Sequence, residues 1–341
     1  MKILCSILPR NDKILKISDT LISMGHEVNI IYQVGYRQQC SYIMKKIDEI
    51  GFSSGRKKYE CQKRRKFHNA IINFKPNVIL FVNYVPEFVD EEDLYRASKS
   101  SRIILLAVDS LAKKETNIEP MLPYEIYTYE PSDIEFIKHK TGISIGYCPI
   151  GYNNVYKKLQ SVPERYIDVS FVGSPYPSRI KTLNKVASVA KKKNWNVKFY
   201  GPFFRNTYPW KKWKWDIKHP ILKKYIINGS ISSGEIADIY RKSKICLNLH
   251  GNDTTGLNPR TFEILATGSF ELVEADRDFR NLIVPEHDVG VFNDADDLVN
   301  KIDYYLSHED ERNSIARNGY EKVRDKISMA KCLESILFDG E

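Results

Sequence analysis

The chain has 341 residues, of which 42% are hydrophobic and 28% are charged, and its net charge is +9. This length leaves room for two domains, and the composition excludes a disordered, collagen-like or coiled-coil chain. The longest strongly apolar runs, Val78–Val82 and Ile103–Val108, are far shorter than the roughly 20 residues that cross a bilayer. Because Pro9 and Arg10 interrupt the apolar start of the chain, we expect a first strand rather than a signal peptide, and a cytoplasmic protein.

The cysteines and histidines give no metal-binding pattern. Six cysteines are scattered without a C-x-x-C pair, and the seven histidines are dispersed. This usage is typical of buried thiols in a reducing compartment, and it predicts no metal site.

Charge is distributed unevenly along the chain. Residues 157–245 hold 20 Lys and Arg against 5 Asp and Glu, whereas residues 246–341 hold 10 against 20. We therefore expect a basic surface on the middle segment, opposite a polyanion or an anionic small ligand. A solvated Lys-rich face remains the alternative, most directly for Lys191, Lys192 and Lys193.

Apolar runs of strand length alternate with amphipathic stretches of helix length, which predicts βαβ units and parallel sheets. In the first half we expect strands at 2–8, 27–33, 78–83, 103–107, 125–129 and 145–148, with helices at 12–24, from 56 onward and at 132–141. In the second half we expect strands at 167–172, 196–200, 245–249 and 270–273, with helices at 178–193, 233–241, 258–267 and from 295 onward. Pro149 and Gly151 mark the joint. This order predicts two doubly wound α/β lobes around a cleft, 1–150 and 151–341, with ligands outside the carboxyl ends of the strands.

The stretch Phe171–Arg179 predicts a strand, a glycine-containing loop and the start of a helix. Gly173 would allow a ligand to approach the backbone, and Arg179 would clamp a phosphate through two N–H groups. Such corners are common in α/β proteins, so a purely structural role stays open. The chain has neither a G-x-G-x-x-G fingerprint nor a Walker loop, which argues against a dehydrogenase or an ordinary NTPase.

The stretch Leu247–Glu263 places two glycines, several hydroxyl and amide side chains, Arg260 and Glu263 between a strand and the first turns of a helix. Backbone amides at the helix start and Arg260 suit a diphosphate, and Glu263 suits the paired hydroxyls of a ribose. A plain helix with an exposed Arg and Glu is the alternative.

Residues 239–250 and 258–268 resemble the C-terminal lobe of GT-B glycosyltransferases, and the nearest group is the spore-maturation (CgeB-like) family. Residues 147–152 resemble the crossing between the lobes, and 169–179 and 199–202 resemble the first strands of the C-terminal lobe, so the resemblance covers about residues 145–335. It implies an N-terminal acceptor lobe and a C-terminal donor lobe. It also implies a UDP-sugar donor such as UDP-glucose, no metal or other cofactor, and a preference for retention.

The resemblance further implies roles for individual residues. Glu263 would bind the ribose, and Arg260 and Arg179 would lie near the phosphates. Related retaining enzymes often carry an E-x7-E pair, whereas Thr255 stands eight positions before Glu263 in this chain. The rest of the expected donor site comprises Gly173, Ser174, Gly251, Asn258 and Thr261.

Two residues are candidates for catalysis. Asp109 directly follows the strand ending near Val108, where a carboxylate would act as acceptor base; a helix N-cap is the alternative. His250 lies in the donor loop.

Two basic runs are candidates for acceptor binding. Residues 208–215 interleave three Trp with three Lys, and within them Trp210, Trp213 and Lys214 are the expected acceptor contacts. Aromatic faces with cations bind sugar rings, nucleobases or an anionic membrane interface. Residues 56–66 include seven Lys and Arg. Solvated helix faces remain the alternative for both runs.

The expected function is transfer of a sugar to a hydroxyl group of an acceptor. A DNA base, an anionic surface polymer and a protein are all compatible, as is peripheral contact with a membrane. Two alternatives stay open: an inactive GT-B shell that binds nucleic acid, and a sugar-nucleotide epimerase.

Overall fold

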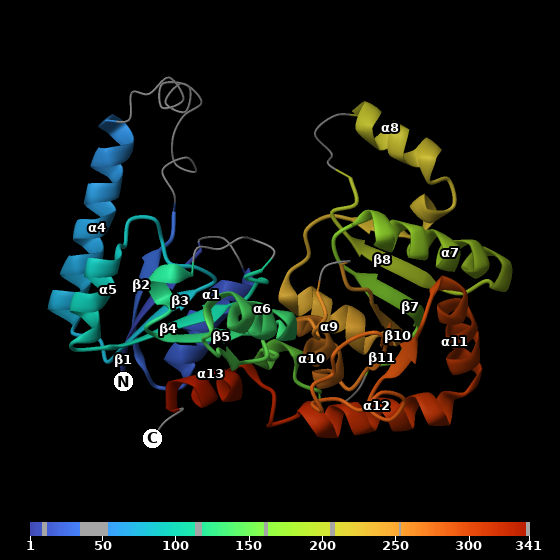
Figure 1. The fold of residues 1–341 in the computed structure, drawn as a ribbon. Coiled ribbons are helices and arrows are strands. Elements are labelled where there is room, and N and C mark those ends of the chain that lie inside the picture. The colour runs from blue at the N-terminus through green and yellow to red at the C-terminus, as the bar shows by residue number, and fades with distance from the viewer. Residues whose placement is uncertain are drawn as a thin grey trace. The chain divides into compact units, whose positions relative to one another are not determined.

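Each half of the chain builds a six-stranded parallel sheet covered by helices (Figure 1). The computed structural model describes residues 1–8, 12–34, 54–112, 118–159, 163–204, 209–251 and 254–338. The chain divides into one unit of Met1–Ile150 with Cys332–Glu341 and a second unit of Gly151–Lys331. The prediction of two α/β lobes is confirmed. No helix in the described ranges is long and apolar enough to cross a membrane.

The first sheet has the order β2-β1-β3-β4-β5-β6. Its strands are β1 (Lys2–Ile7), β2 (Glu27–Tyr32), β3 (Val78–Val82), β4 (Arg102–Ala107), β5 (Glu125–Thr128) and β6 (Gly146–Tyr147). The helices are α1 (Asp12–Ser23), α4 (Ser54–Phe74), α5 (Glu91–Ser98), α6 (Pro131–Thr141) and α13 (Met329–Phe338), with a 3-10 turn at Glu119–Met121.

Helices cover both faces of this sheet. Phe67 of α4, Leu94 of α5 and Ile137 of α6 share one core cluster with alternate residues of the central strands. Because α1 leads from β1 to β2 and α4 leads back across β1 to β3, right-handed crossovers place these two helices on opposite faces. A glycine in the left-handed region follows both α1 and α6, where Gly25 and Gly142 have φ of 85° and 76°.

The last described helix, α13, belongs to the first unit from Cys332 onward, although its residues fall in the range expected for the second lobe. The Arg102 guanidinium at the start of β4 donates to the carbonyl oxygens of Leu337 (2.5 Å) and Ile336 (3.3 Å). The Cys148 thiol lies 3.5 Å from the carbonyl oxygen of Cys332. These contacts tie the end of the described chain to a sheet built by its beginning.

The second sheet has the order β12-β11-β10-β7-β8-β9. Its strands are β7 (Ile167–Val172), β8 (Val197–Gly201), β9 (Ile226–Asn228), β10 (Ser243–Asn248), β11 (Phe270–Glu274) and β12 (Gly290–Phe292). The helices are α7 (Pro177–Lys193), α8 (Pro209–Lys218), α9 (Ser233–Arg241), α10 (Pro259–Ala266), α11 (Ala295–Ser307) and α12 (Glu309–Val323), with 3-10 turns at Asn154–Tyr156 and Leu222–Lys224.

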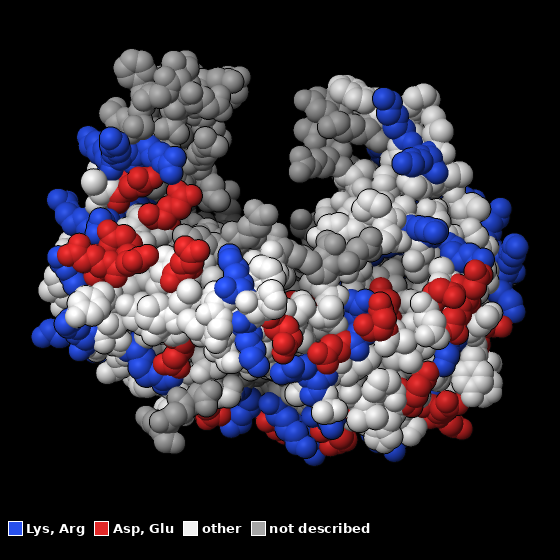
Figure 2. Space-filling view, in the orientation of Figure 1, with Lys and Arg blue, Asp and Glu red and all other residues white. Residues whose placement is uncertain are grey.

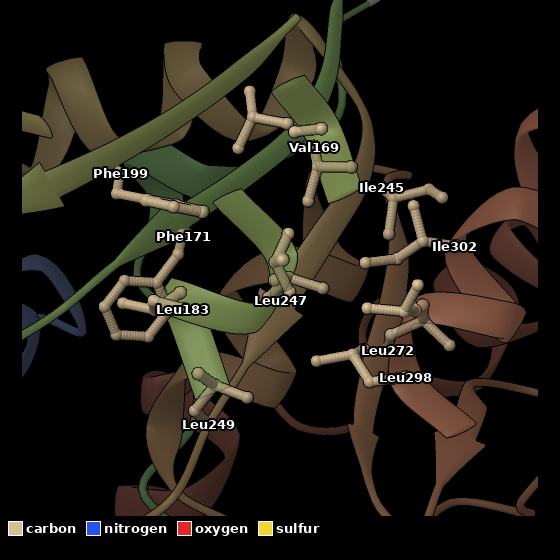
Figure 3. Close-up of a cluster of buried hydrophobic side chains, with 14 of the residues drawn as sticks. Val169, Phe171, Leu183, Phe199, Ile245, Leu247, Leu249, Leu272, Leu298 and Ile302 are labelled. Atoms are coloured by element: carbon tan, nitrogen blue, oxygen red, sulfur yellow. The ribbon is translucent and has the colours of Figure 1, made fainter. Parts of the chain in front are cut away.

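The two faces of the second sheet differ in polarity near the ends of the central strands. On one face Leu247 of β10 is in register with Phe171 and Leu272, and these apolar side chains pack against α7 and α11 (Figure 3). The intervening residues Asn248 and Glu271 point to the other face, which α9 and α10 cover, and they are fully buried there. A polar layer therefore lies beneath α10.

Among the α-helices and strands in the described ranges, α5, α8, β9 and β12 lie outside the sequence prediction. The two strands have only three residues each. In α8 the apolar positions do not form one stripe, because Trp215 lies on the side of the helix opposite Trp210, Trp213 and Ile217.

Candidate functional site

The centre of the second sheet is a topological switch point. β7 and β10 are neighbours, but the chain leaves β7 toward β8 and β9 and leaves β10 toward β11 and β12. In parallel α/β sheets, ligands bind outside the carboxyl ends of the strands at such a point. The loops that follow these two strands carry most of the donor residues expected from the sequence.

Two glycines allow these loops to approach each other. A Cβ on Gly173 would lie 2.8 Å from the Phe171 ring and 3.4 Å from a guanidinium nitrogen of Arg260. Gly201 at the end of β8 has φ of 149°, and a Cβ there would lie 2.1 Å from the Gly173 carbonyl oxygen. The loop after β7 therefore lies directly against the arginine of α10.

Two arginine side chains converge at this edge. Arg179 is 7% exposed, and its guanidinium donates to the Ser174 carbonyl oxygen (3.1 Å) and lies 4.7 Å from the centre of the Tyr176 ring. Burial and the neighbouring Arg260 lower the pKa of Arg179 to about 10. Its Nε is buried without a partner, and no carboxylate in the described ranges forms an ion pair with Arg179 or Arg260. Such a pair of guanidinium groups favours an anion.

A buried network fixes the start of α10. Asn258 caps the helix, with its Oδ1 accepting from the Arg260 amide at 2.9 Å. The Asn248 amide donates to Glu271 (2.7 Å) and Thr261 (3.0 Å), and its Oδ1 accepts from Asn258 (2.9 Å) and from the Arg260 guanidinium (3.3 Å). Burial raises the pKa of Glu271 to about 7. The network therefore holds both the helix N-terminus and Arg260.

His250 connects β11 to the same helix. Its Nδ1 lies 2.7 Å from the carboxylate of Glu274, and its Nε2 accepts from the backbone N–H of Asn258 at 3.2 Å. The imidazole is neutral in this arrangement, and burial lowers its pKa against the opposing effect of Glu274. Both ring nitrogens are engaged within the protein, which is the geometry of a positioning residue. Gly251 follows, with a Cβ position 4.0 Å from the Tyr176 ring.

Glu263 lies on the first turns of α10 and is 7% exposed. Its carboxylate lies close enough to the hydroxyl of Tyr156 to influence the ionisation of that group. Burial and the Glu263 charge raise the pKa of Tyr156. The Tyr240 hydroxyl beside them is buried and has no hydrogen-bond partner among the residues that the structure describes. Glu263 is thus held by an aromatic cluster rather than exposed on a plain helix.

The loop between β10 and α10 is tied to the loop after β11. The Thr255 carbonyl oxygen accepts from the Asp278 amide at 2.8 Å, and the Arg277 guanidinium donates to the Thr254 carbonyl oxygen. Asn252 and Asp253, which belong to the polar stretch singled out in the sequence, lie outside the described residues.

Asp109 lies in the first unit, just beyond β4. Asn83 donates to its Oδ2 at 3.0 Å. The next residues are held by Asp133, whose carboxylate accepts from the Ser110 hydroxyl (2.8 Å) and the Leu111 amide (2.8 Å). No helix within the described residues begins at Asp109, so the structure does not give it the N-cap role.

The two basic runs differ in the structure. In α4, Arg56 pairs with Glu60 and Glu87, and Arg64 pairs with Asp90 and Asp93. Figure 2 accordingly shows blue and red side chains together on this side of the first unit. This run is partly neutralised within the protein.

The second run forms α8, where Trp210 and Trp213 are 55% and 64% exposed and Lys214 is also exposed. Tyr208 and the side chain of Lys211 lie outside the described residues. Over the described ranges, no group of three or more His, Cys, Asp or Glu residues is placed to hold a metal ion.

The sequence prediction assigns no individual role to five residues of the site: Asn248, Glu271, Glu274, Tyr156 and Tyr240. A weak signal existed for the first three. Asn248 and Glu271 interrupt otherwise apolar strands, and Glu274 ends one. The tyrosines carry no such signal, since their approach to Glu263 depends on the tertiary fold.

A family model described as glycosyl transferase-like matches residues 166–337. No curated protein matches the sequence.

Solved structures match almost the whole chain. A glycosyltransferase from Rickettsia africae has a TM-score of 0.69 at 15% identity, covering 98% of this chain and 97% of that chain. Sucrose-phosphate synthase from Thermosynechococcus elongatus has a TM-score of 0.67 at 11% identity, covering 99% and 98%. Anabaena HepE in complex with UDP-glucose has a TM-score of 0.67 at 10% identity, covering 99% and 98%. These likenesses confirm the expected GT-B fold.

Proposed function

Because the chain belongs to the glycosyl transferase-like family, we propose that its second unit binds a UDP-sugar, with UDP-glucose as the first candidate. The sugar passes to a hydroxyl group of a macromolecular acceptor, with retention of its configuration. Within the family we assign the chain to the spore-maturation (CgeB-like) group, on the motif around residues 258–268. The complex of HepE with UDP-glucose supports the choice of nucleotide.

The observation that carries this proposal is the convergence of Arg179 and Arg260 beside Gly173, without a carboxylate partner among the described residues. A diphosphate would complete their ion pairs and would lie at the positive end of the α10 dipole. Gly173 and Ser174 supply a backbone close to that anion. We propose that this positive charge replaces a divalent metal and that no other cofactor is required.

The remaining donor residues have distinct roles. Glu263 accepts from the ribose hydroxyls, while Asn258 and Thr261 hold the start of α10. Gly251 keeps the adjoining loop clear of the diphosphate. His250 acts as a positioning residue instead of the catalytic residue expected from the sequence, because its ring nitrogens bond to Glu274 and to the Asn258 amide.

The protein supplies two things to the transfer step. Arg179, Arg260 and the helix N-terminus stabilise the charge that develops on the departing diphosphate. In the first unit, Asp109 orients the acceptor hydroxyl and takes its proton. The bond between the sugar and the diphosphate breaks, and the bond between the sugar and the acceptor oxygen forms.

Nucleotide binding tests the donor site. We expect UDP and UDP-glucose to raise the melting temperature in proportion to ln(1 + [L]/Kd), and other nucleoside diphosphates to do so less. Glu263→Gln keeps the size of the side chain but weakens a charged hydrogen bond to ribose, so UDP affinity should fall roughly tenfold, about 1.4 kcal/mol, while pyrophosphate affinity stays unchanged. Glu321→Gln, at an exposed ion pair with Arg324, is the matched control.

The outcomes separate the alternatives. If no nucleotide binds and DNA binds with a strong dependence on salt, the chain is an inactive shell and the proposal is wrong. If the UDP-sugar is converted into another UDP-sugar without an acceptor and without release of UDP, the chain is an epimerase. Transfer to water or to an added acceptor with release of UDP supports the proposal.

A further inference from the structure

Helix α8 presents an apolar stripe to solvent. Trp210, Trp213 and Ile217 are 55%, 64% and 60% exposed. They stand three and four residues apart, so they share one face of the helix. Large apolar side chains rarely gather on an exposed face unless that face binds something.

The orientation of α8 is fixed by its opposite side. The Trp215 ring lies 6.2 Å from the ring of Phe203, 6.3 Å from Phe204 and 4.3 Å from His219. Phe203 belongs to the core cluster of the second unit, and Trp215 packs against that cluster. Because one tryptophan anchors the helix inward, the other two are held outward.

The stripe is bordered by positive charge. Lys214, Lys218, Lys223 and Lys224 are exposed on α8 and on the 3-10 turn that follows. Asp216 is the only acidic residue between 209 and 228, and it pairs with Lys212 at 2.7 Å. In Figure 2 the region over α8 shows blue and white atoms at one end of the second unit.

We propose that the face of α8 formed by Trp210, Trp213, Ile217, Lys214 and Lys218 docks on an anionic lipid bilayer. The two indole rings and Ile217 enter the interface between headgroups and acyl chains, and the lysines pair with lipid phosphates. The helix lies in the plane of the membrane and does not cross it. This inference does not depend on the donor site and goes beyond it.

A bilayer fits these side chains better than a nucleic acid or an apolar protein groove would. Tryptophan is enriched where one end of a ring meets hydrocarbon and the other meets water, and lysines flank such helices on anionic lipid. A nucleic acid would use the two rings for stacking but has no use for Ile217 on the same stripe. The positive charge of the lysines complements an anionic lipid surface. A neutral apolar groove of a protein would offer the lysines no negative charge.

Vesicle sedimentation tests the proposal with the full chain. We expect binding to vesicles of equal parts phosphatidylcholine and phosphatidylglycerol, and at least tenfold weaker binding to phosphatidylcholine alone. The double variant Trp210→Ser/Trp213→Ser should lose at least tenfold in affinity for the anionic vesicles. Ile72→Ser and Tyr95→Ser, at residues that are 67% and 60% exposed on α4 and α5, are the matched controls and should bind like the parent.

Two further measurements keep the result interpretable. A blue shift of tryptophan fluorescence on adding anionic vesicles should disappear in the double variant, and its melting temperature should match the parent. Lys214→Gln/Lys218→Gln should weaken binding and reduce its dependence on salt. UDP affinity, measured separately, reports on the proposed donor site and not on this face.

The following results would overturn the inference. One is vesicle binding by the double variant equal to that of the parent. Another is tight, salt-dependent binding of single-stranded DNA by the parent with no vesicle binding, which would make the face a nucleic-acid surface. Equal binding to neutral and anionic vesicles would overturn the proposal that the lysines select an anionic bilayer.

Discussion

The carboxyl edges of the two sheets are built alike but carry opposite charge. In the second unit, Arg179 and Arg260 meet there without a carboxylate partner among the described residues. In the first unit, the corresponding edge holds Asp109, and the buried Asp133 binds the loop that follows it. Gln33 spans two strand ends there, donating to the carbonyl oxygens of Ser6 and Tyr84, both at 2.9 Å.

Under the proposed function, this contrast divides the reaction between the two units. Topology supplies both edges with loops and backbone groups, so the few side chains that end each strand decide what is bound. Unneutralised cations suit a diphosphate, whereas a carboxylate suits a hydroxyl group that must lose a proton. The predictions below test each edge separately.

The largest effect is expected at the first edge. Asp109→Asn keeps the size of the side chain and removes its basicity, so turnover should fall roughly 100- to 10,000-fold, the usual contribution of a positioned general base. UDP affinity should not change, because the donor groups lie in the other unit. Measured turnover and UDP titration check both points, with Asp19→Asn, on the exposed side of α1, as the control. Unchanged turnover would remove Asp109 from the mechanism.

A smaller effect is expected at the second edge. Arg260→Gln should weaken both UDP and pyrophosphate by about 2 to 3 kcal/mol, roughly 30- to 150-fold, because it removes charged hydrogen bonds to the diphosphate. Arg260→Lys should recover part of the loss, since lysine keeps the charge but not the planar fork. Isothermal titration measures both variants, and Arg324→Gln, which removes an exposed arginine of the same unit, should bind like the parent. If Arg324→Gln lost as much affinity as Arg260→Gln, the loss would reflect the net charge of the unit and not a contact of Arg260 with the diphosphate.

The smallest effect is a change of stability with pH. Burial raises the folded pKa of Glu271 to about 7, above its ordinary value. The protonated form is therefore favoured in the fold, so its contribution to stability is complete at low pH and is lost as the pH rises through about 7. The loss falls in the pH range between the ordinary carboxyl pKa and about 7. Glu271→Gln keeps both hydrogen bonds to Oε1, so its melting temperature should fall less over this range than that of the parent. Parallel curves for parent and variant would contradict the assignment.

The fold was accessible from sequence because its signals are local. The strand from Ile167 to Val172 and the helix from Ser233 to Arg241 have the expected bounds, since apolar runs and a capping box define them within a few residues. The loops at 173–179 and 250–263 were also visible, because glycine and arginine stand where strands give way to helices.

The arrangement within the site was not accessible in the same way. Asn248 meets Glu271, and Tyr156 meets Glu263, only after strands and turns far apart in the chain have packed together. The position of His250 between Glu274 and the Asn258 amide likewise depends on the register of β10 and β11. Residue type alone could name a histidine in a polar loop but not show that both nitrogens are engaged.

The return of α13 to the first unit has a consequence for the order in which the chain can fold. Residues 1–150 precede the whole second unit, yet some contacts of Arg102 and Cys148 form only with Leu337, Ile336 and Cys332 at the end of the described chain. During synthesis the second unit, Gly151–Lys331, is therefore available in full before the first unit is. The unit that is synthesised first is therefore completed last. A chain cut before Cys332 would leave the first unit without its contacts to α13.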